Sequence, residues 1–175
     1  MIVLAYVAPT VRSVGDAVTA ADQNIIANDV INLDSRIALT EGAWTSFTPT
    51  YTNLTVGNGV SVAAYKQVGN TVFCRVSFTF GTTSSMGTDP YFSLPVTSKT
   101  VTGNTLFPFP TLILDSGTTY YYGFARLFYG SPSAVTLFTL SATGTYTSYA
   151  GISATVPMTW TTGDGFSTTL VYEAA

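Results

Sequence analysis

The sequence predicts a mainly β protein, an antiparallel β-sandwich of jelly-roll type preceded by an extended arm and one short N-terminal helix. From Thr71 to Phe80, apolar and polar side chains alternate without a break, as in a strand with one face in a core. Gly69-Asn70 precedes this run and suits a tight hairpin turn, because both residue types tolerate positive φ. Similar runs recur between turn residues from Trp44 onward without a second helical pattern, so about eight strands are expected.

The composition indicates a surface that is nearly neutral and rich in hydroxyl groups. Of the 175 residues, 46% are hydrophobic and only 9% are charged, and the formal net charge is −3. Such a surface suits contact with other protein subunits better than it suits a free cytosolic enzyme, which normally stays soluble through its charge. The 6 Lys and Arg residues are scattered singly. The sequence therefore predicts no nucleic-acid partner.

The first 43 residues have a pattern of their own. Residues 1–8 read MIVLAYVA and are followed at once by Pro9 and Arg12. This apolar run is too short for a membrane span and lacks the positive start of a signal peptide. We therefore expect no membrane span. We interpret the run as an extended arm that adds to a sheet edge or lies on a partner.

A helix is expected to follow the arm. Thr19 is a good N-cap residue, and Asp22 stands three residues later, as in a capping box. The helix is expected to run from Ala20 to about Leu39 and to end at Gly42.

The apolar seam of this helix has two interpretations. Spacings of four, three and four residues, typical of a short coiled coil, separate Ile26, Val30, Leu33 and Ile37. In one interpretation the helix packs on its own domain. In the other it bundles with copies of itself around a symmetry axis. A short helix is marginal alone, so something must cover the seam.

Residues 44–175 are expected to form the β-sandwich domain. A loop is expected at Gly81–Pro90, Pro108 and Pro110 are expected to bracket a bend, and residues 146–151 to form a second loop. The strands expected around the central run are Val60–Val68, Tyr91–Val96, Thr100–Leu106, Leu112–Leu114, Tyr120–Tyr129, Ala134–Leu140, Ile152–Trp160 and Phe166–Tyr172.

No pattern typical of catalysis is found. The chain lacks histidine, the commonest general base and metal ligand. Its single cysteine, Cys74, falls on the apolar face of its strand, so we interpret it as a small buried hydrophobe rather than a reactive thiol. No nucleophile motif, phosphate loop or metal-ligand spacing is found. The sequence therefore predicts no catalytic residues, no cofactor site and no metal site.

The tyrosines are the remaining candidates for binding. Tyr120, Tyr121 and Tyr122 are consecutive, so a strand sends at least one of them to each face. Tyr146 and Tyr149 stand in a stretch of Gly, Ser and Thr. Exposed tyrosines stack on sugars or anchor protein interfaces. These five residues are candidates for contact with a glycan or a protein partner, and packing between sheets or subunits is the alternative.

Several stretches resemble structural proteins of tailed bacteriophages. Residues 15–24, GDAVTAADQN, resemble the G-x-x-[VL]-T-A-A-x-x-N run that leads into a helix in many of these proteins. Residues 44–50, WTSFTPT, together with 56–59 and 65–69, resemble the β-domain that often follows. The ending, residues 160–175, is similar to the last hairpin of that domain. The middle of the chain, between 81 and 150, matches no family pattern.

The resemblance implies a non-enzymatic virion protein of the minor tail, fibre or head-fibre type, often trimeric. We therefore expect a homotrimer with Ile26, Val30, Leu33 and Ile37 on its axis, bound to tail or capsid proteins through residues 1–20. The β-domain would project for host attachment, with a host cell-surface glycan as candidate ligand. One alternative is a capsid decoration or head-fibre protein on the major capsid shell. Another is a free carbohydrate-binding module, which predicts a monomer.

Overall fold

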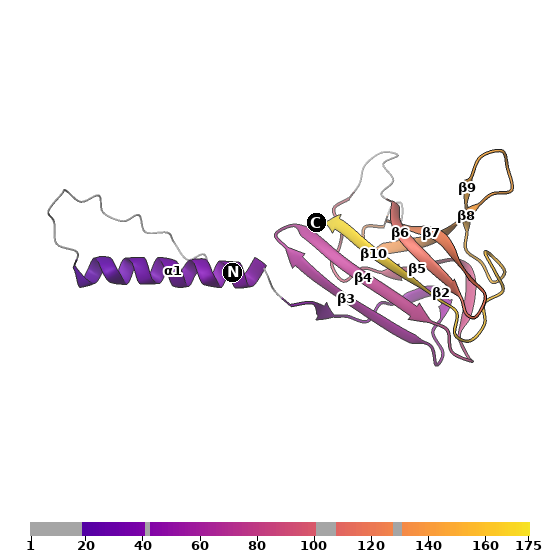
Figure 1. Ribbon diagram of the computed structural model, residues 1–175, viewed down its shortest axis with the longest axis horizontal. Coiled ribbons are helices and arrows are strands. Elements are labelled where there is room, and N and C mark those ends of the chain that lie inside the picture. Colours follow the sequence, from indigo (N-terminus) through magenta and orange to yellow (C-terminus); the bar gives the residue numbers. More distant parts are fainter. Residues whose placement is uncertain (1–18, 41–42, 101–107, 128–130) are drawn as a thin grey trace. The chain divides into compact units, whose positions relative to one another are not determined.

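The computed structural model describes residues 19–40, 43–100, 108–127 and 131–175, with helix side chains described up to residue 33 (Figure 1). The arm at residues 1–8 lies outside these ranges, as does almost all of the expected strand Thr100–Leu106. Contacts within the chain divide it into two units, residues 1–42 and 43–175.

The helix of the first unit, α1, runs from Ala20 to Thr40, as the sequence predicts. Its first turn forms a reciprocal capping box. The backbone amide of Thr19 donates to the carboxylate of Asp22 at 2.8 Å, and the amide of Asp22 donates to the hydroxyl of Thr19 at 3.3 Å. These bonds satisfy amides that have no partner within the helix, which is why the helix begins here.

The second unit is antiparallel β structure, so the predicted fold class, mainly β after one N-terminal helix, is confirmed. The described strands form one curled sheet in the order β1-β3-β4-β10-β6-β7-β8-β5-β2, with β9 paired to β8. The order does not assign the jelly-roll type, which stays a prediction. The strands are β1 (Thr45–Ser46), β2 (Tyr51–Thr55), β3 (Val60–Val68), β4 (Thr71–Thr79), β5 (Ser85–Ser93), β6 (Pro108–Asp115), β7 (Thr119–Leu127), β8 (Ala134–Ser141), β9 (Ser148–Gly151) and β10 (Gly165–Glu173).

The hairpin of β3 and β4 is confirmed at the predicted turn. Val68 pairs with Thr71 across Gly69-Asn70, and Gly69 has a φ of 58°. The alternation along β4 is also confirmed, because every second residue is buried and its neighbours are more exposed. The buried set on this strand and just beyond it is Val72, Cys74, Val76, Phe78 and Phe80.

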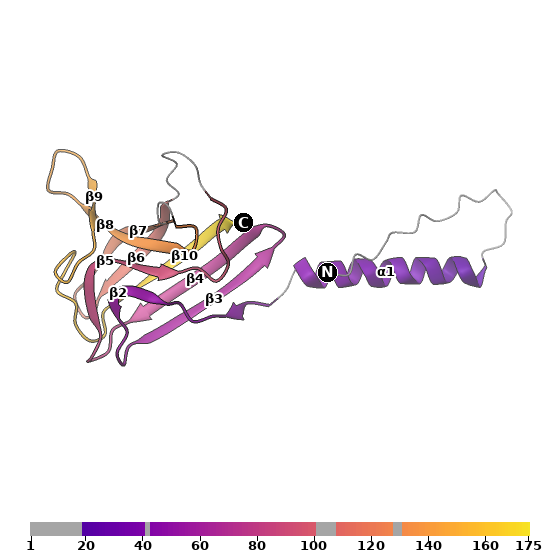
Figure 2. The same cartoon turned by 180° about the vertical axis from the view of Figure 1, so that it is seen from behind.

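The sheet curls so that its two ends face each other across the core. Figure 1 shows β3, β4 and β10 nearest the viewer, and Figure 2, from behind, shows β2 and β5. The ring of Tyr51 in β2 lies 5.4 Å from that of Phe78 in β4, and its hydroxyl is 2.7 Å from that of Ser61 in β3. The rings of Phe92 in β5 and Phe166 in β10 are stacked at 6.5 Å. This packing buries the apolar faces of both halves, as in a sandwich.

Two strands lie where loops are expected. β5 includes residues 85–90 of the expected loop, and β9 includes residues 148–151. The sequence of β5 does not show regular alternation of buried and exposed residues, because the strand is irregular. Asp89 has a φ of 49°, and the pairing with β2 shifts register between Thr52 and Leu54. Irregular strands of this kind lack a clean period of two.

The bend expected at Pro108 and Pro110 is wrong, because both residues belong to β6. They pair with Arg126 and Phe124 of β7 on one side. On the other side, the pairing of β6 with β10 begins only at Thr111. Proline is tolerated there because the missing N–H is not needed for a second ladder.

The strand expected at Ile152–Trp160 is also wrong, because this stretch has no strand of its own. Ile152 and Met158 are buried, so its apolar residues do enter the core. Trp160 stacks on Phe80 at 5.0 Å and donates from Nε1 to the carbonyl of Ser153 at 2.9 Å. The stretch is therefore a packed loop held by side chains.

Candidate functional site

The predicted seam of the helix is exposed as far as its side chains are described. Ile26, Val30 and Leu33 are 58%, 60% and 55% exposed. The side chain of Ile37, the fourth seam residue, lies outside the described part. Exposure of large aliphatic side chains to water is unfavourable and their burial lowers the free energy, so this face is a candidate contact surface.

The three consecutive tyrosines are divided between the two faces of β7. Tyr121 is half-buried and packs against the core. Tyr120 and Tyr122 point to the outer face and are 59% and 72% exposed. The structure therefore keeps two of these three predicted contact residues accessible and turns the third inward.

Strand pairing places Tyr122 at the end of a row that crosses five strands on the outer face. The pairs in register are Val62 with Ser77, Ser77 with Ser167, Ser167 with Leu112, and Leu112 with Tyr122. We call these five residues the first row. The side chains on β4 and β10 are both serines and are small. The side chains on β3, β6 and β7 are larger. The row is therefore hollow at β4 and β10, where a cavity of about 520 Å³ lies.

A second row lies two residues along each strand and has its smallest residue, Gly165, on β10. It joins Val60 to Thr79, Thr79 to Gly165, Gly165 to Leu114, and Leu114 to Tyr120. A hollow of about 240 Å³ lies over this row and shares Ser77, Leu112 and Ser167 with the first. We call the two hollows together the outer groove. It follows β4 and β10 on the outer face, with Tyr120 and Tyr122 on one side.

The floor of the outer groove carries hydroxyl groups. Ser167 and Thr169 in β10 are exposed, and Ser77 in β4 makes only a long bond of 3.4 Å to the carbonyl of Val62. Each hydroxyl offers both a donor and an acceptor. Among the described residues that line the groove there is no carboxylate, and the charged side chain is Arg75. Its guanidinium lies 4.6 Å from the ring of Trp44, which holds it in place.

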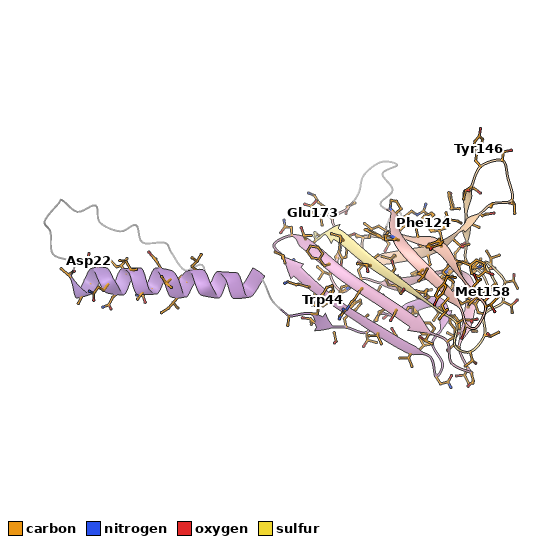
Figure 3. The ribbon with its side chains drawn as sticks, in the orientation of Figure 1. Asp22, Trp44, Phe124, Tyr146, Met158 and Glu173 are labelled. Atoms are coloured by element: carbon orange, nitrogen blue, oxygen red, sulfur yellow. The ribbon has the colours of Figure 1, made fainter. Side chains whose placement is uncertain are left out.

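The other two predicted contact residues lie elsewhere, near the β8–β9 hairpin. Tyr149 packs edge-on against the rings of Phe138 and Phe124, at 5.4 and 6.0 Å. Arg126 covers Phe138 at 4.5 Å. Tyr146 is 85% exposed at the tip of the hairpin and points away from the sheet (Figure 3). The five predicted tyrosines therefore do not form one site.

The environment of Cys74 is apolar. The residue is buried, and burial raises the pKa of its thiol to about 12. Because the thiolate is the reactive form, this favours the interpretation of Cys74 as a packing residue.

The groove residues on β4, β10 and β6 were not predicted as a site from the sequence. Ser77, Ser167 and Leu112 are far apart along the chain and have no motif in common. The one local signal is the alternation in each strand, which places them on the outer face. Their adjacency depends on strand order, which no local pattern in the sequence specifies.

No group of three or more His, Cys, Asp or Glu in the described part is placed to hold a metal ion. Within the same residues, no helix has the length and apolar character to cross a membrane. Comparison of the chain with protein-family models, with curated proteins and with solved structures found no significant match.

Proposed function

We propose that this chain is a non-enzymatic structural protein of a tailed-bacteriophage virion, a trimeric tail-associated fibre or minor tail protein whose β unit attaches to the host surface. The observation that carries the proposal is the two-part layout. A helix with an exposed apolar seam precedes an antiparallel β unit with its own core. The proposed class of protein, a phage structural protein, rests on the resemblance of residues 15–24 and 44–50 to such proteins.

The helix is proposed as the trimerising element. Its seam residues Ile26, Val30 and Leu33 are exposed in the single chain, and a bundle of copies would cover them. Each fully buried aliphatic side chain contributes about 1.5–3 kcal/mol. Three copies of the seam therefore supply enough free energy to hold a short bundle that one helix alone does not hold.

The β unit is proposed as the part that contacts the host. Its outer face carries exposed tyrosines and hydroxyl groups around an open groove. Aromatic rings with a polar tip are common at recognition surfaces, because they combine apolar contact with hydrogen bonding.

Particle composition tests the proposal directly. Mass spectrometry of purified particles of the phage that encodes the chain is expected to detect it at a copy number divisible by three. Its absence from washed particles would refute the virion assignment. The control is a non-structural phage protein of similar abundance in the lysate, which washing should remove.

Location on the particle separates the tail form of the proposal from the capsid form. In the capsid form, residues 1–20 attach the chain to the major capsid shell. Antibody against residues 81–150 that blocks adsorption would support the tail form. Shells that lose heat stability when the protein is missing would support decoration of the capsid.

A second candidate function is favoured by the outer groove itself. A free carbohydrate-binding module would use the same tyrosines and hydroxyls but would have no use for the exposed helix seam. It predicts a monomer in solution. Light scattering on the purified full chain distinguishes the two functions, because the virion proposal requires three chains.

A further inference from the structure

The shape of the outer groove follows from the two transverse rows on the outer face. Each row has Val on β3, a hydroxyl residue on β4, Ser or Gly on β10, Leu on β6 and Tyr on β7. The hollow is therefore long in the direction of the strands and bounded on both sides. Residues two apart on β7 are separated by about 6.6 Å, so the rings of Tyr120 and Tyr122 mark successive positions along it.

The second row is kept hollow by backbone packing. A Cβ atom added at Gly165 would overlap the carbonyl oxygen of Phe78 on the neighbouring strand. The β10 position of this row is therefore limited to glycine, and the hollow next to Tyr120 stays open.

The chemistry of the lining selects the class of ligand. Tyr122 is 72% exposed and offers a ring to an apolar face of the ligand. The hydroxyls of Ser77, Ser167 and Thr169 offer donors and acceptors to polar edges. Without a carboxylate in the described lining, no strong attraction for a cationic ligand is present. An elongated ligand with apolar faces and many hydroxyl groups fits this combination.

We propose that the outer groove binds a saccharide chain. One sugar ring stacks on Tyr122, with its hydroxyl groups hydrogen-bonded to Ser77 and Ser167, and the next ring along the chain lies against Tyr120. The inference rests on the proposed attachment function and names its ligand class. A second copy of this chain fits less well, because the hydroxyl floor is recessed between the side chains of Val62 and Leu112.

Binding of the purified full chain to an oligosaccharide array tests the inference. The probes are oligomers of glucose, galactose, mannose, rhamnose and N-acetylglucosamine, with acidic oligomers of uronic acids as a comparison. We expect at least one neutral oligomer of three or more units to bind, with affinity then measured by calorimetry. Binding of a neutral or an acidic oligomer supports the inference, and an array on which nothing binds overturns it.

Substitutions in and outside the groove test whether the saccharide binds there. Tyr122→Ala is expected to lower the affinity at least tenfold, and Ser167→Leu, which fills the floor, to abolish binding. The matched control is Tyr146→Ala, an exposed tyrosine outside the groove, which should bind as the wild type does. Equal affinities for all three variants would overturn the inference.

Light scattering on the same variants separates this inference from the proposed function. Tyr122→Ala is expected to keep the mass of the wild type. A lower mass would instead identify the groove as a contact between copies and overturn the saccharide assignment. The absence of saccharide binding would overturn the inference but would not change the particle composition or the mass in solution, which test the proposed function. The two proposals can therefore fail independently.

Discussion

The carboxylate of Asp164 accepts a hydrogen bond of 2.8 Å from the backbone amide of Ser116, which stands 48 residues earlier. The same carboxylate accepts bonds from the amide and hydroxyl of Thr161 at 2.5 and 3.2 Å. Asp164 is fully buried, so these protein donors replace water. The contact joins the β6–β7 turn to the loop before β10, beside the second row of the outer groove.

Replacing Asp164 with Ala is expected to lower the free energy of unfolding by about 3 kcal/mol, because hydrogen bonds to charged groups contribute about 1.5–3 kcal/mol and two backbone amides in part-buried bonds would lose their acceptor. Urea denaturation followed by fluorescence measures the change. Asp115→Ala, next to Ser116 at the end of β6, is the control, with an expected change below about 0.5 kcal/mol. Equal losses in the two variants would show that the buried carboxylate has no special role.

Gly165→Ala is expected to destabilise the β unit by about 1–3 kcal/mol, because the added methyl group overlaps the carbonyl oxygen of Phe78 and the strands must move apart. Gly144→Ala is the control, since a Cβ there has its nearest neighbour at 3.7 Å. Thermal unfolding by circular dichroism compares them. A Gly165→Ala protein as stable as the wild type would contradict the close packing of β4 and β10.

Leu33→Asp is expected to reduce the mass in solution from three chains to one, because a charge would be buried without a partner on the axis of the bundle. Multi-angle light scattering at micromolar concentration gives the mass. Asn28→Asp adds the same charge at an exposed position off the seam and should remain trimeric. A monomeric wild type, or a trimeric Leu33→Asp, would rule out the helix as the trimerising element.

The thiol of Cys74 is expected to resist labelling by iodoacetamide at pH 8 in the native protein and to react within minutes in guanidinium chloride. Its pKa is raised to about 12 by burial, so almost no thiolate is present in the folded state. Mass spectrometry counts the labelled fraction. Labelling at equal rates in both conditions would contradict the buried position.

The same burial predicts a loss of stability at high pH. The raised pKa of Cys74 means that the folded state holds its proton while the unfolded state releases it above pH 9.0, the ordinary value, so the free energy of unfolding falls as the pH rises from there toward about 12. Burial also raises the pKa of Tyr51 and Tyr172, which adds to the fall at still higher pH. Urea denaturation at pH 7 and pH 10.5 measures this fall in the free energy of unfolding. In Cys74→Ala the difference between the two pH values should be smaller.

Local patterns determined the parts of the fold that depend on neighbours in the sequence. The capping box of Thr19 and Asp22 and the hairpin at Gly69-Asn70 form where the sequence predicts them. The reason is that caps, tight turns and a period of two arise from residues within a few positions of each other. Strands such as β5 were missed because their irregular backbone depends on pairing with β2.

The candidate site was only partly predictable. The sequence singled out Tyr120 and Tyr122, and the rule of alternation already required Tyr121 to face the other way. The partners of these two tyrosines in the outer groove come from β3, β4, β10 and β6, over a span from Val60 to Thr169. Only the tertiary structure brings them together, because strand order and register are decided by burial of the core across the curled sheet, and no pattern within one strand records its neighbours.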